Sequence, residues 1–433
     1  MTYRFAVPRS SNADITGWFF YIILDILEHM SQSTLEVLRL VYYLSFFFVP
    51  FFLVVTLFDL WLVYKRMIWI AKQTYIMLEI KVPKEVFKSP KAMEFFIAGL
   101  SKGSNETTWI DRLWKGQTRP QFSLEIVSID GGVHFFVRTR KWLQGALEAN
   151  LYSQYPGVEV HEVPDYTLPV KYDPETVGLW GTEFALSEAD VFPIKTYVDY
   201  GMDKDPKEEF KIDPLTPFIE YIASLGRGHQ MWFQIIVRSH KAEYKDPETG
   251  KMIDKKWKKD AEVQIKKILE NAKGEKGEDG KYSSSRYLTQ AEQDKITALD
   301  RSISKVAFDV GMRFIYTAPK DIFVGTNVSG AMGGIMNFNA PHLNGFKPVR
   351  DTGGKYNYPW QDKNKKKTNK EKVKMLDAYK KRGYFYNENK RPYFVLNTEE
   401  LATIFHLPGQ VSTTPTLERV ESRKIEAPAN LPI

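Results

Sequence analysis

One uninterrupted apolar run, Val41–Val63, constrains this chain more than any other feature of its sequence. The run spans 23 residues and contains a single charged residue, Asp59. About 20 apolar residues in a helix cross the hydrocarbon of a bilayer, and Pro50 in the middle of the run is tolerated in a membrane helix. A signal peptide would be shorter and closer to the first residue. We therefore predict a transmembrane helix with a cytoplasmic extension over residues 41–72.

Positive charge on one flank predicts the orientation of this helix. The twenty residues after the run carry four Lys or Arg, whereas the twenty before it carry only Arg39. Because Lys and Arg collect on the cytoplasmic side of membranes, we expect a single-pass protein with the bulk of the chain in the cytoplasm. A second apolar stretch, Ile15–Leu27, is short and contains Asp25, which favours an interfacial helix within segment 1–40. If that stretch crosses the bilayer instead, the N-terminus returns to the cytoplasm.

The remainder of the chain has the composition of a folded protein. Charged residues make up 26% of the sequence, and 433 residues are enough for more than one globular unit. There is no cysteine, which excludes disulfides, thiol catalysis and cysteine-ligated metals.

Secondary-structure signals after the membrane segment follow the order β-α-β-β-α-β, which is typical of a ferredoxin-like unit. The turn between the two middle strands is Asp130–Gly132, a strong hairpin signal. We predict a first α+β domain of this kind over residues 73–170. Its strands are expected at 74–82, 121–129, 133–137 and 158–163, with helices that begin after Ser89 and after Thr139.

A second ferredoxin-like unit is predicted over residues 171–410, followed by a C-terminal tail at 411–433. Two charged insertions interrupt this second unit, at 241–304 and 350–391. The first insertion reads as a polar helical arm. The strands of the second unit are expected at 191–200, 230–237, 306–316 and 393–396, with helices that begin at Asp213 and near Asp321.

The second insertion is the source of the positive net charge of the protein. Residues 355–391 hold thirteen Lys or Arg and four Asp or Glu, a net charge of +9, so that −2 remains for the rest of the chain. Lysines neutralise phosphates, and aromatic rings stack on bases or lie at a lipid interface. The stretch is a solvated insertion, a nucleic-acid site or a site for the anionic leaflet. Its candidate binding residues are Lys365, Lys366, Lys367, Lys370, Lys372, Lys380, Lys381, Arg382, Tyr384 and Tyr386.

We find no known catalytic motif in the sequence. Gly325–Gly330 is followed by Ala331 and Met332 where a phosphate-binding loop needs Lys and then Ser or Thr. The seven histidines lack a metal-ligand spacing, and the sequence contains neither a nucleophile elbow nor a dinucleotide-binding loop. We therefore expect a non-enzymatic protein without catalytic residues, cofactor or metal.

The stretch FVLNTEELATIFHLPGQ, Phe394–Gln410, predicts a short strand followed by a helix with a capping box at its N-terminus. Asn397 and Glu400 have the spacing of a capping box. Leu401, Ile404 and Phe405 share one face of the helix, which indicates that this face packs against something.

Three stretches resemble one protein family. Phe122–Tyr166, Val395–Gly409 and Ile80–Leu100 are similar to the non-motor region of bacterial type IV secretion and conjugative DNA-transfer ATPases. In that family a RecA-like motor with Walker motifs follows the element that Val395–Gly409 resembles. No such motor follows here, so the resemblance implies a motorless relative at the bacterial inner membrane.

The resemblance also implies a function and partners. A membrane-anchored, non-catalytic scaffold or docking subunit would recruit a separate hexameric ATPase, with Glu399, Glu400, Ile404 and Phe405 as the candidate docking residues. The expected partners are this ATPase, the lipid bilayer, DNA and further copies of the chain. The alternative is a membrane-tethered protein that binds nucleic acid or anionic lipid through residues 355–391.

Overall fold

The computed structural model of the chain comprises two compact units, Met1–Lys65 and Arg66–Ile433. The predicted interfacial stretch Ile15–Leu27 lies outside the described residues, as does most of the tail 411–433. The residues described are 32–83, 88–101, 108–203, 212–241, 244–245, 252–253, 256–272, 287–354, 356, 358, 360–386, 390–409 and 419–420.

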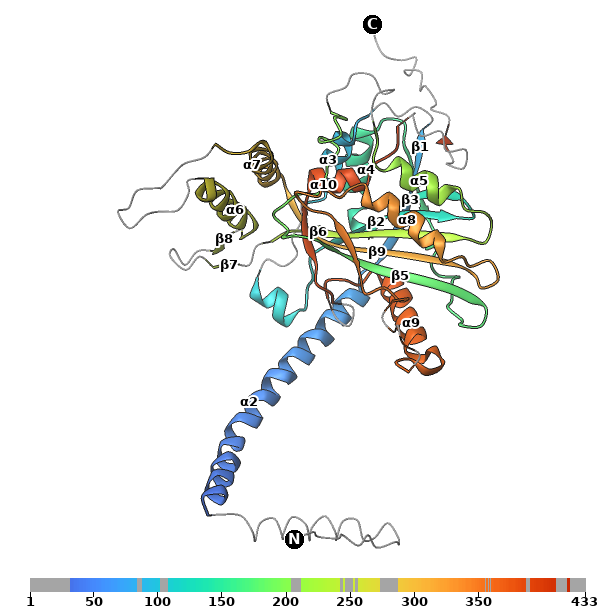
Figure 1. Cartoon of the computed structure of the whole chain (residues 1–433). Coiled ribbons are helices and arrows are strands. Elements are labelled where there is room, and N and C mark those ends of the chain that lie inside the picture. The colour runs from blue at the N-terminus through green and yellow to red at the C-terminus, as the bar shows by residue number, and fades with distance from the viewer. Residues whose placement is uncertain are drawn as a thin grey trace, which may run out of the picture. The chain divides into compact units, whose positions relative to one another are not determined.

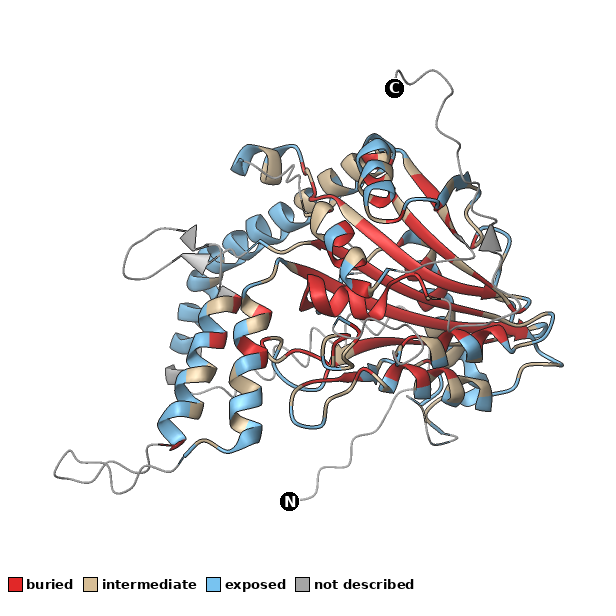
Figure 2. Ribbon diagram, turned by 90° about the horizontal axis from the view of Figure 1, so that it is seen from above, coloured by how far each residue is buried: buried red, intermediate tan, exposed pale blue. Residues whose placement is uncertain are grey.

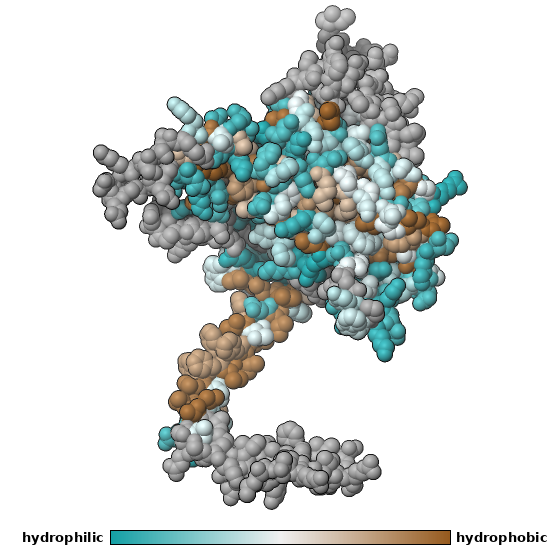
Figure 3. Space-filling model, in the orientation of Figure 1, coloured by the Kyte–Doolittle hydropathy of each residue, from teal (hydrophilic) through white to brown (hydrophobic). Residues whose placement is uncertain are grey.

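The predicted membrane helix is part of a longer helix, α2 (Gln32–Ala71), which contains Pro50 and ends inside the second unit. Between Arg39 and Ala71 it is long and apolar enough to cross a membrane, and among the described residues it is the one helix of this kind. Large side chains such as Phe47 and Leu57 are exposed along it, and Figure 3 shows this apolar surface in brown. Apolar surface of this extent is stable when lipid or protein covers it.

The second unit is built on one sheet, to which the described residues contribute ten strands and which is antiparallel except where β12 pairs with β1 (Figure 1). Along the sheet the order is β10-β5-β9-β6-β2-β3-β1-β12, with β11 also paired to β9 and β4 to β1. The strands are β1 (Tyr75–Pro83), β2 (Gln121–Ile129), β3 (Gly132–Arg140), β4 (Glu159–Val163), β5 (Val177–Leu186), β6 (Gln230–Ser239), β9 (Ala307–Pro319), β10 (Phe346–Val349), β11 (Phe394–Asn397) and β12 (Arg419–Val420).

Two successive halves of the chain use the same strand order. The spatial order of the strands is β4-β1-β3-β2 in the first half and β10-β5-β9-β6 in the second. If the strands of each half are counted along the chain, without β7 and β8 of the insertion, both orders are fourth, first, third, second. The halves join where β2 pairs with β6, from Gln121 opposite Arg238 to Ile129 opposite Gln230. The fold is therefore α+β with a single sheet that runs through both halves.

The predicted elements of the first half are confirmed apart from one helix start. The β2–β3 hairpin turns at Asp130 and Gly131, which both have positive φ, as a two-residue turn of this kind requires. Thr139, predicted to cap the next helix, lies instead within β3 and is buried. A 3₁₀ turn, η2 (Lys141–Leu143), precedes the helix.

In the second half two predicted strands are corrected. Residues 191–200 form turns and loop, and the first strand is β5, which the sequence pattern did not predict. The predicted last strand exists as β11, yet it pairs with β9 as an additional strand, while β10 takes the fourth place. The first error arises because Gly178 and Gly181 weaken the strand signal of β5. Gly178 is required, since a Cβ there would lie 2.4 Å from the Phe323 ring.

Among the described residues, five helices cover one face of the sheet, and their apolar side chains form the main core with those of the strands. In Figure 2 the central strands are mostly red, which marks them as buried. The 3.6-residue spacing predicted for Met93, Phe96 and Ile97 places all three in this core. The five helices are α3 (Pro90–Gly99), α4 (Gln144–Gln154), α5 (Thr216–Ala223), α8 (Thr326–Met336) and α10 (Thr398–Ile404).

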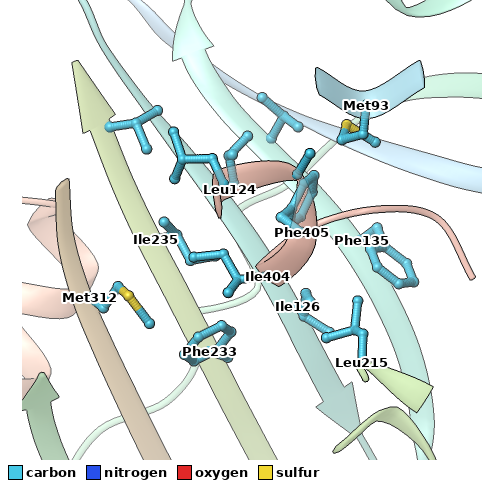
Figure 4. Close-up of a cluster of buried hydrophobic side chains, with 14 of the residues drawn as sticks. Met93, Leu124, Ile126, Phe135, Leu215, Phe233, Ile235, Met312, Ile404 and Phe405 are labelled. Atoms are coloured by element: carbon cyan, nitrogen blue, oxygen red, sulfur yellow. The ribbon is translucent and has the colours of Figure 1, made fainter. Parts of the chain in front are cut away.

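The helix α10 fills the centre of this layer. Figure 4 shows Ile404 and Phe405 among side chains from both halves, such as Leu124 of β2 and Ile235 of β6. The ring of Phe405 also meets Phe135 of β3 edge-on. The predicted capped helix is thus confirmed, and what it packs against is the junction between the two halves.

The insertions add helices elsewhere. Helix α9 (Lys366–Lys381) covers the opposite face of the sheet through Met375, Leu376 and Tyr379 (Figure 1). The first insertion forms a helical hairpin, α6 (Lys256–Ala272) and α7 (Gln290–Ile303), which agrees with the predicted arm. The remaining short elements are β7 (Tyr244–Lys245), β8 (Met252–Ile253), the π-helical turn η1 (Ile110–Trp114) and the 3₁₀ turn η4 (Lys363–Lys365).

Replacing Phe405 by Ala tests the place of α10 in the core. We expect the free energy of unfolding to fall by about 3–5 kcal/mol, because a buried ring is lost and a cavity remains. Phe95→Ala is the matched control, since Phe95 is exposed on α3 and its loss changes stability by about 0.5 kcal/mol or less. Urea denaturation of the full chain in mild detergent, followed by tryptophan fluorescence, measures both. Equal stability of the two variants would contradict the assignment.

Candidate functional site

Polar side chains gather on the face of the sheet that α9 covers, opposite the main core. Glu125 of β2 and Gln234 of β6 stand directly across from one another in the pairing that joins the halves. Both are fully buried. The Gln234 amide donates to a Glu125 carboxylate oxygen at 3.0 Å, and the Ser123 hydroxyl donates to the same oxygen. A buried carboxylate at this position needs a cation.

Arg382 supplies that cation from the end of α9. Its Nε and Nη2 donate to the two Glu125 oxygens at 3.0 and 3.1 Å. The remaining donors reach Asp165, with Nη2 to Oδ1 at 3.1 Å and Nη1 to Oδ2, and the Lys380 carbonyl at 2.8 Å. Burial alone would raise the pKa values of Glu125 and Asp165, yet the Arg382 guanidinium lowers both.

Two tyrosines complete this network. The Tyr166 hydroxyl donates to Glu125 at 2.8 Å and lies 2.8 Å from the Tyr379 hydroxyl. Burial raises the pKa of each tyrosine well above the usual value, so both stay protonated. The hydrogen bonds of the network are made within the protein. Its role is therefore to fasten α9 to the seam between the halves.

A second charged group lies beside α9, around the buried carboxylate of Glu183 on β5. The Arg313 Nε of β9 donates to it at 3.0 Å, and Arg391 and Arg350 lie 3.4 and 3.8 Å away. Three guanidinium groups thus share one carboxylate, at the edge of a cavity of about 430 Å³ that Lys374 also lines. Asp351 and Glu371 also line this cavity, so together with Glu183 they balance its basic lining residues Arg350, Lys374 and Arg391. The Arg313 guanidinium is stacked on Tyr384 at 4.7 Å, and the lining has no excess charge that would attract an anion.

The ten predicted binding residues fall into three groups by burial. Lys365, Lys366, Lys367 and Lys370 lie exposed at the start of α9, and Lys381 is exposed at its end. Lys372 and Lys380 are half-buried, and burial lowers the pKa of each. Arg382 and Tyr384 are buried and Tyr386 is half-buried, so the buried pair serves packing rather than contact with a ligand.

The four predicted docking residues are all buried. Asn397 and Glu400 form the expected capping box, with both reciprocal hydrogen bonds at 2.9 Å. Burial raises the pKa of Glu400 to about 8. Glu399 accepts from the Thr196 hydroxyl at 2.6 Å and pairs with Arg301 at 3.1 Å. In this structure Glu399, Glu400, Ile404 and Phe405 hold α10 in the core and offer no surface to a partner.

An exposed aromatic pair next to the lysines was not predicted from the sequence. Tyr358 and Trp360 stack on each other at 4.8 Å, and they are 55% and 76% exposed. Their signal in the sequence is the pattern Tyr-x-Trp directly ahead of the lysine run. Among the described residues, no group of acidic or histidine side chains is arranged to hold a metal ion.

Replacing Arg382 by Met tests the buried network. The unfolding free energy should fall by about 3–5 kcal/mol, because two carboxylates lose their buried cation. Lys381→Met removes the same charge one residue earlier, where the exposed Lys381–Asp377 pair contributes about 0–1 kcal/mol. Urea denaturation of the full chain in mild detergent distinguishes the two. A loss below about 1 kcal/mol for R382M would show that the network is not a structural requirement.

Comparison with known proteins places the folded region in a family. No curated protein matches the chain. A family model described as a domain of unknown function (DUF8128) matches residues 70–419. That range begins in the last turn of α2 and takes in both halves of the sheet and α10. The chain therefore belongs to the DUF8128 family.

Proposed function

We propose that this chain is a membrane-anchored, non-catalytic scaffold that docks a separate hexameric ATPase of a type IV secretion-like or conjugative transfer machine. The apolar helix α2 supports the anchor. The projecting hairpin α6–α7 carries the docking part of the proposal, because it is fixed to the sheet at its base and presents an exposed mixed surface. We therefore propose this surface as the docking site, instead of Glu399, Glu400, Ile404 and Phe405 of α10 and its C-cap, which are buried.

The fold-level part of the proposal is that both halves are ferredoxin-like units. The strand order fourth-first-third-second in each half supports it, as do the helices after the first and third strands, which cover the same face. Joined edge to edge through β2 and β6, two such units make a rigid platform. A scaffold needs a rigid platform of this kind to position a partner near the membrane.

The hairpin is anchored at its base and open along its outer side. Trp257 of α6 is buried against Val191 and Val395, and its indole N–H donates to the Asp190 carbonyl at 3.2 Å. Further along α6, Leu269 and Lys266 are exposed. Exposed aliphatic and basic side chains spaced three residues apart on one helix fit a partner with an apolar groove and an acidic rim.

Affinity purification of the full chain in mild detergent tests this proposal. We expect it to recover an ATPase that hydrolyses ATP and has a hexameric mass by mass photometry. The double variant Lys266→Glu, Leu269→Glu should abolish the recovery. Glu at position 266 would repel the acidic rim of the partner, and Glu at position 269 would bury a carboxylate in its apolar groove. Val324→Glu, also at an exposed aliphatic position, should retain it. Repeated failure to recover such an ATPase, or equal recovery by the hairpin variant, would reject the proposal.

A second candidate function is nucleic-acid binding by the tethered unit, favoured by the exposed Tyr358–Trp360 pair. Aromatic faces accept stacked bases, and nearby lysines neutralise phosphates. Lys365, Lys366, Lys367 and Lys370 supply those charges at the start of α9. Tyr384, predicted for stacking, is buried, so the exposed pair takes that role.

Binding of single-stranded DNA as a function of salt tests the second candidate. Changing the four lysines to Gln should lower the log–log salt slope by about 0.7 for each phosphate that is no longer neutralised. Trp360→Ala should weaken binding by about 1–3 kcal/mol at every salt concentration. The control changes Lys91, Lys141, Lys320 and Lys347, which are exposed elsewhere, to Gln. If this control loses as much affinity as the α9 variant, the effect is one of net charge alone and the site is rejected.

A further inference from the structure

A large basic cavity lies away from α9, between the end of α2, the end of β6, helix α6 and a set of residues that includes Phe385, Lys390 and Val395. Its volume is about 970 Å³, at the upper end of the range of about 300–1,000 Å³ for small-molecule sites. Six Lys or Arg line it against two acids, Asp190 and Asp260. The basic lining residues are Arg66, Arg112, Arg119, Arg238, Lys241 and Lys390.

The back wall of the cavity concentrates positive charge around one carboxylate. Asp309 of β9 is buried and accepts from the Arg238 Nε at 2.8 Å and contacts the His240 Nδ1 at 2.6 Å. Arg119 Nη1 lies 3.5 Å from the same carboxylate. Two arginines therefore share one negative charge, so this wall carries a net positive charge. The Arg238 guanidinium is held in place over the Phe385 ring at 4.2 Å.

The buried nitrogens of the lining include Nε2 of His240 and Nε of Arg66, and these two atoms have no hydrogen-bond partner among the described residues. Buried polar atoms are nearly always paired, so these two indicate a missing partner. An oxyanion in the cavity would accept from Arg66, and it would bind His240 either through its own hydroxyl or by accepting from the protonated ring.

The surroundings of the cavity indicate where such an anion comes from. Arg66 follows the apolar run of α2 by three residues in the chain, so one lining residue of the cavity is only three residues away from the predicted membrane helix in the sequence. Arg112 and Leu113 of η1 also line it, and Trp109 and Trp114 at either end of that turn are 67% and 65% exposed. Exposed tryptophans flanked by arginine and lysine are typical of a lipid headgroup interface.

We propose that this cavity binds the phosphate-bearing headgroup of an anionic phospholipid, while Trp109 and Trp114 enter the interface beside it. The site would hold the folded unit against the bilayer in a defined orientation. The inference rests on the anchoring by α2 and does not depend on an ATPase or on nucleic acid.

Native mass spectrometry of the full chain in detergent, with added dihexanoyl phosphatidylglycerol, tests the proposal. Wild type should retain this lipid and release dihexanoyl phosphatidylcholine, whose headgroup carries no net charge. The triple variant Arg66→Gln, Lys241→Gln, Lys390→Gln should bind phosphatidylglycerol at least about tenfold more weakly, because each basic residue contributes to the attraction. The matched variant Lys365→Gln, Lys366→Gln, Lys370→Gln, which loses the same charge on α9, should bind it as wild type does.

Three results would overturn the proposal. Equal retention of the two lipids by wild type would show that charge is not recognised, and this comparison needs no variant. Unchanged phosphatidylglycerol binding by the cavity variant would place the lipid elsewhere. Binding of glycerol 3-phosphate or inorganic phosphate as tight as that of the short-chain lipid would assign the cavity to a soluble phosphorylated molecule instead. Loss of lipid in Trp109→Ser with Trp114→Ser would support the interfacial position.

Discussion

The pairing of β2 with β6 is the contact on which the rest of the folded unit depends. An exposed strand edge promotes uncontrolled association. In each half, the second strand along the chain, β2 or β6, would form such an edge. Pairing the two edges over nine residues on each strand removes both and produces one continuous sheet. The sheet is then buried on both faces near the seam, which is why β2 and β6 have almost no exposed position.

Burial on both faces decides what each side of the seam must contain. On the helical face, α10 fills the space between the halves with Ile404 and Phe405. On the other face the strands carry Glu125 and Gln234, and this polarity would be costly without Arg382. Helix α9 brings the guanidinium to the carboxylate, and Arg382, directly after its last residue, adopts a positive φ. The basic insertion is therefore tied into the fold at the end of α9, whereas the first turns of that helix are exposed to solvent.

The sequence was sufficient to predict most elements that have an apolar period or a sharp boundary signal. The long apolar helix α2, the Asp130–Gly131 hairpin and the Asn397 cap are examples, because each depends on local chemistry alone. The candidate site was harder to predict. The burial of Arg382 and Tyr384 depends on Glu125 and Gly311, which are distant in the chain. A Cβ at Gly311 would lie 2.4 Å from the Tyr384 ring, so the ring position depends on a glycine that no local pattern singles out.

The basic cavity could not be predicted from the sequence either, because it also depends on residues that are distant in the chain. Its arginines and lysines come from separate segments of the chain, and their approach to one another is a product of the fold. One of these residues, Arg66, lies near the end of α2. The last turn of this helix packs on the sheet. The Arg140 guanidinium lies 4.4 Å from the Trp69 ring and its Nη2 donates to the Thr118 carbonyl at 3.2 Å. The helix is thereby fixed to β3 next to the cavity. A headgroup bound there and an apolar helix in the bilayer would hold the sheet at two neighbouring points, so that the unit could not swivel freely about a single tether.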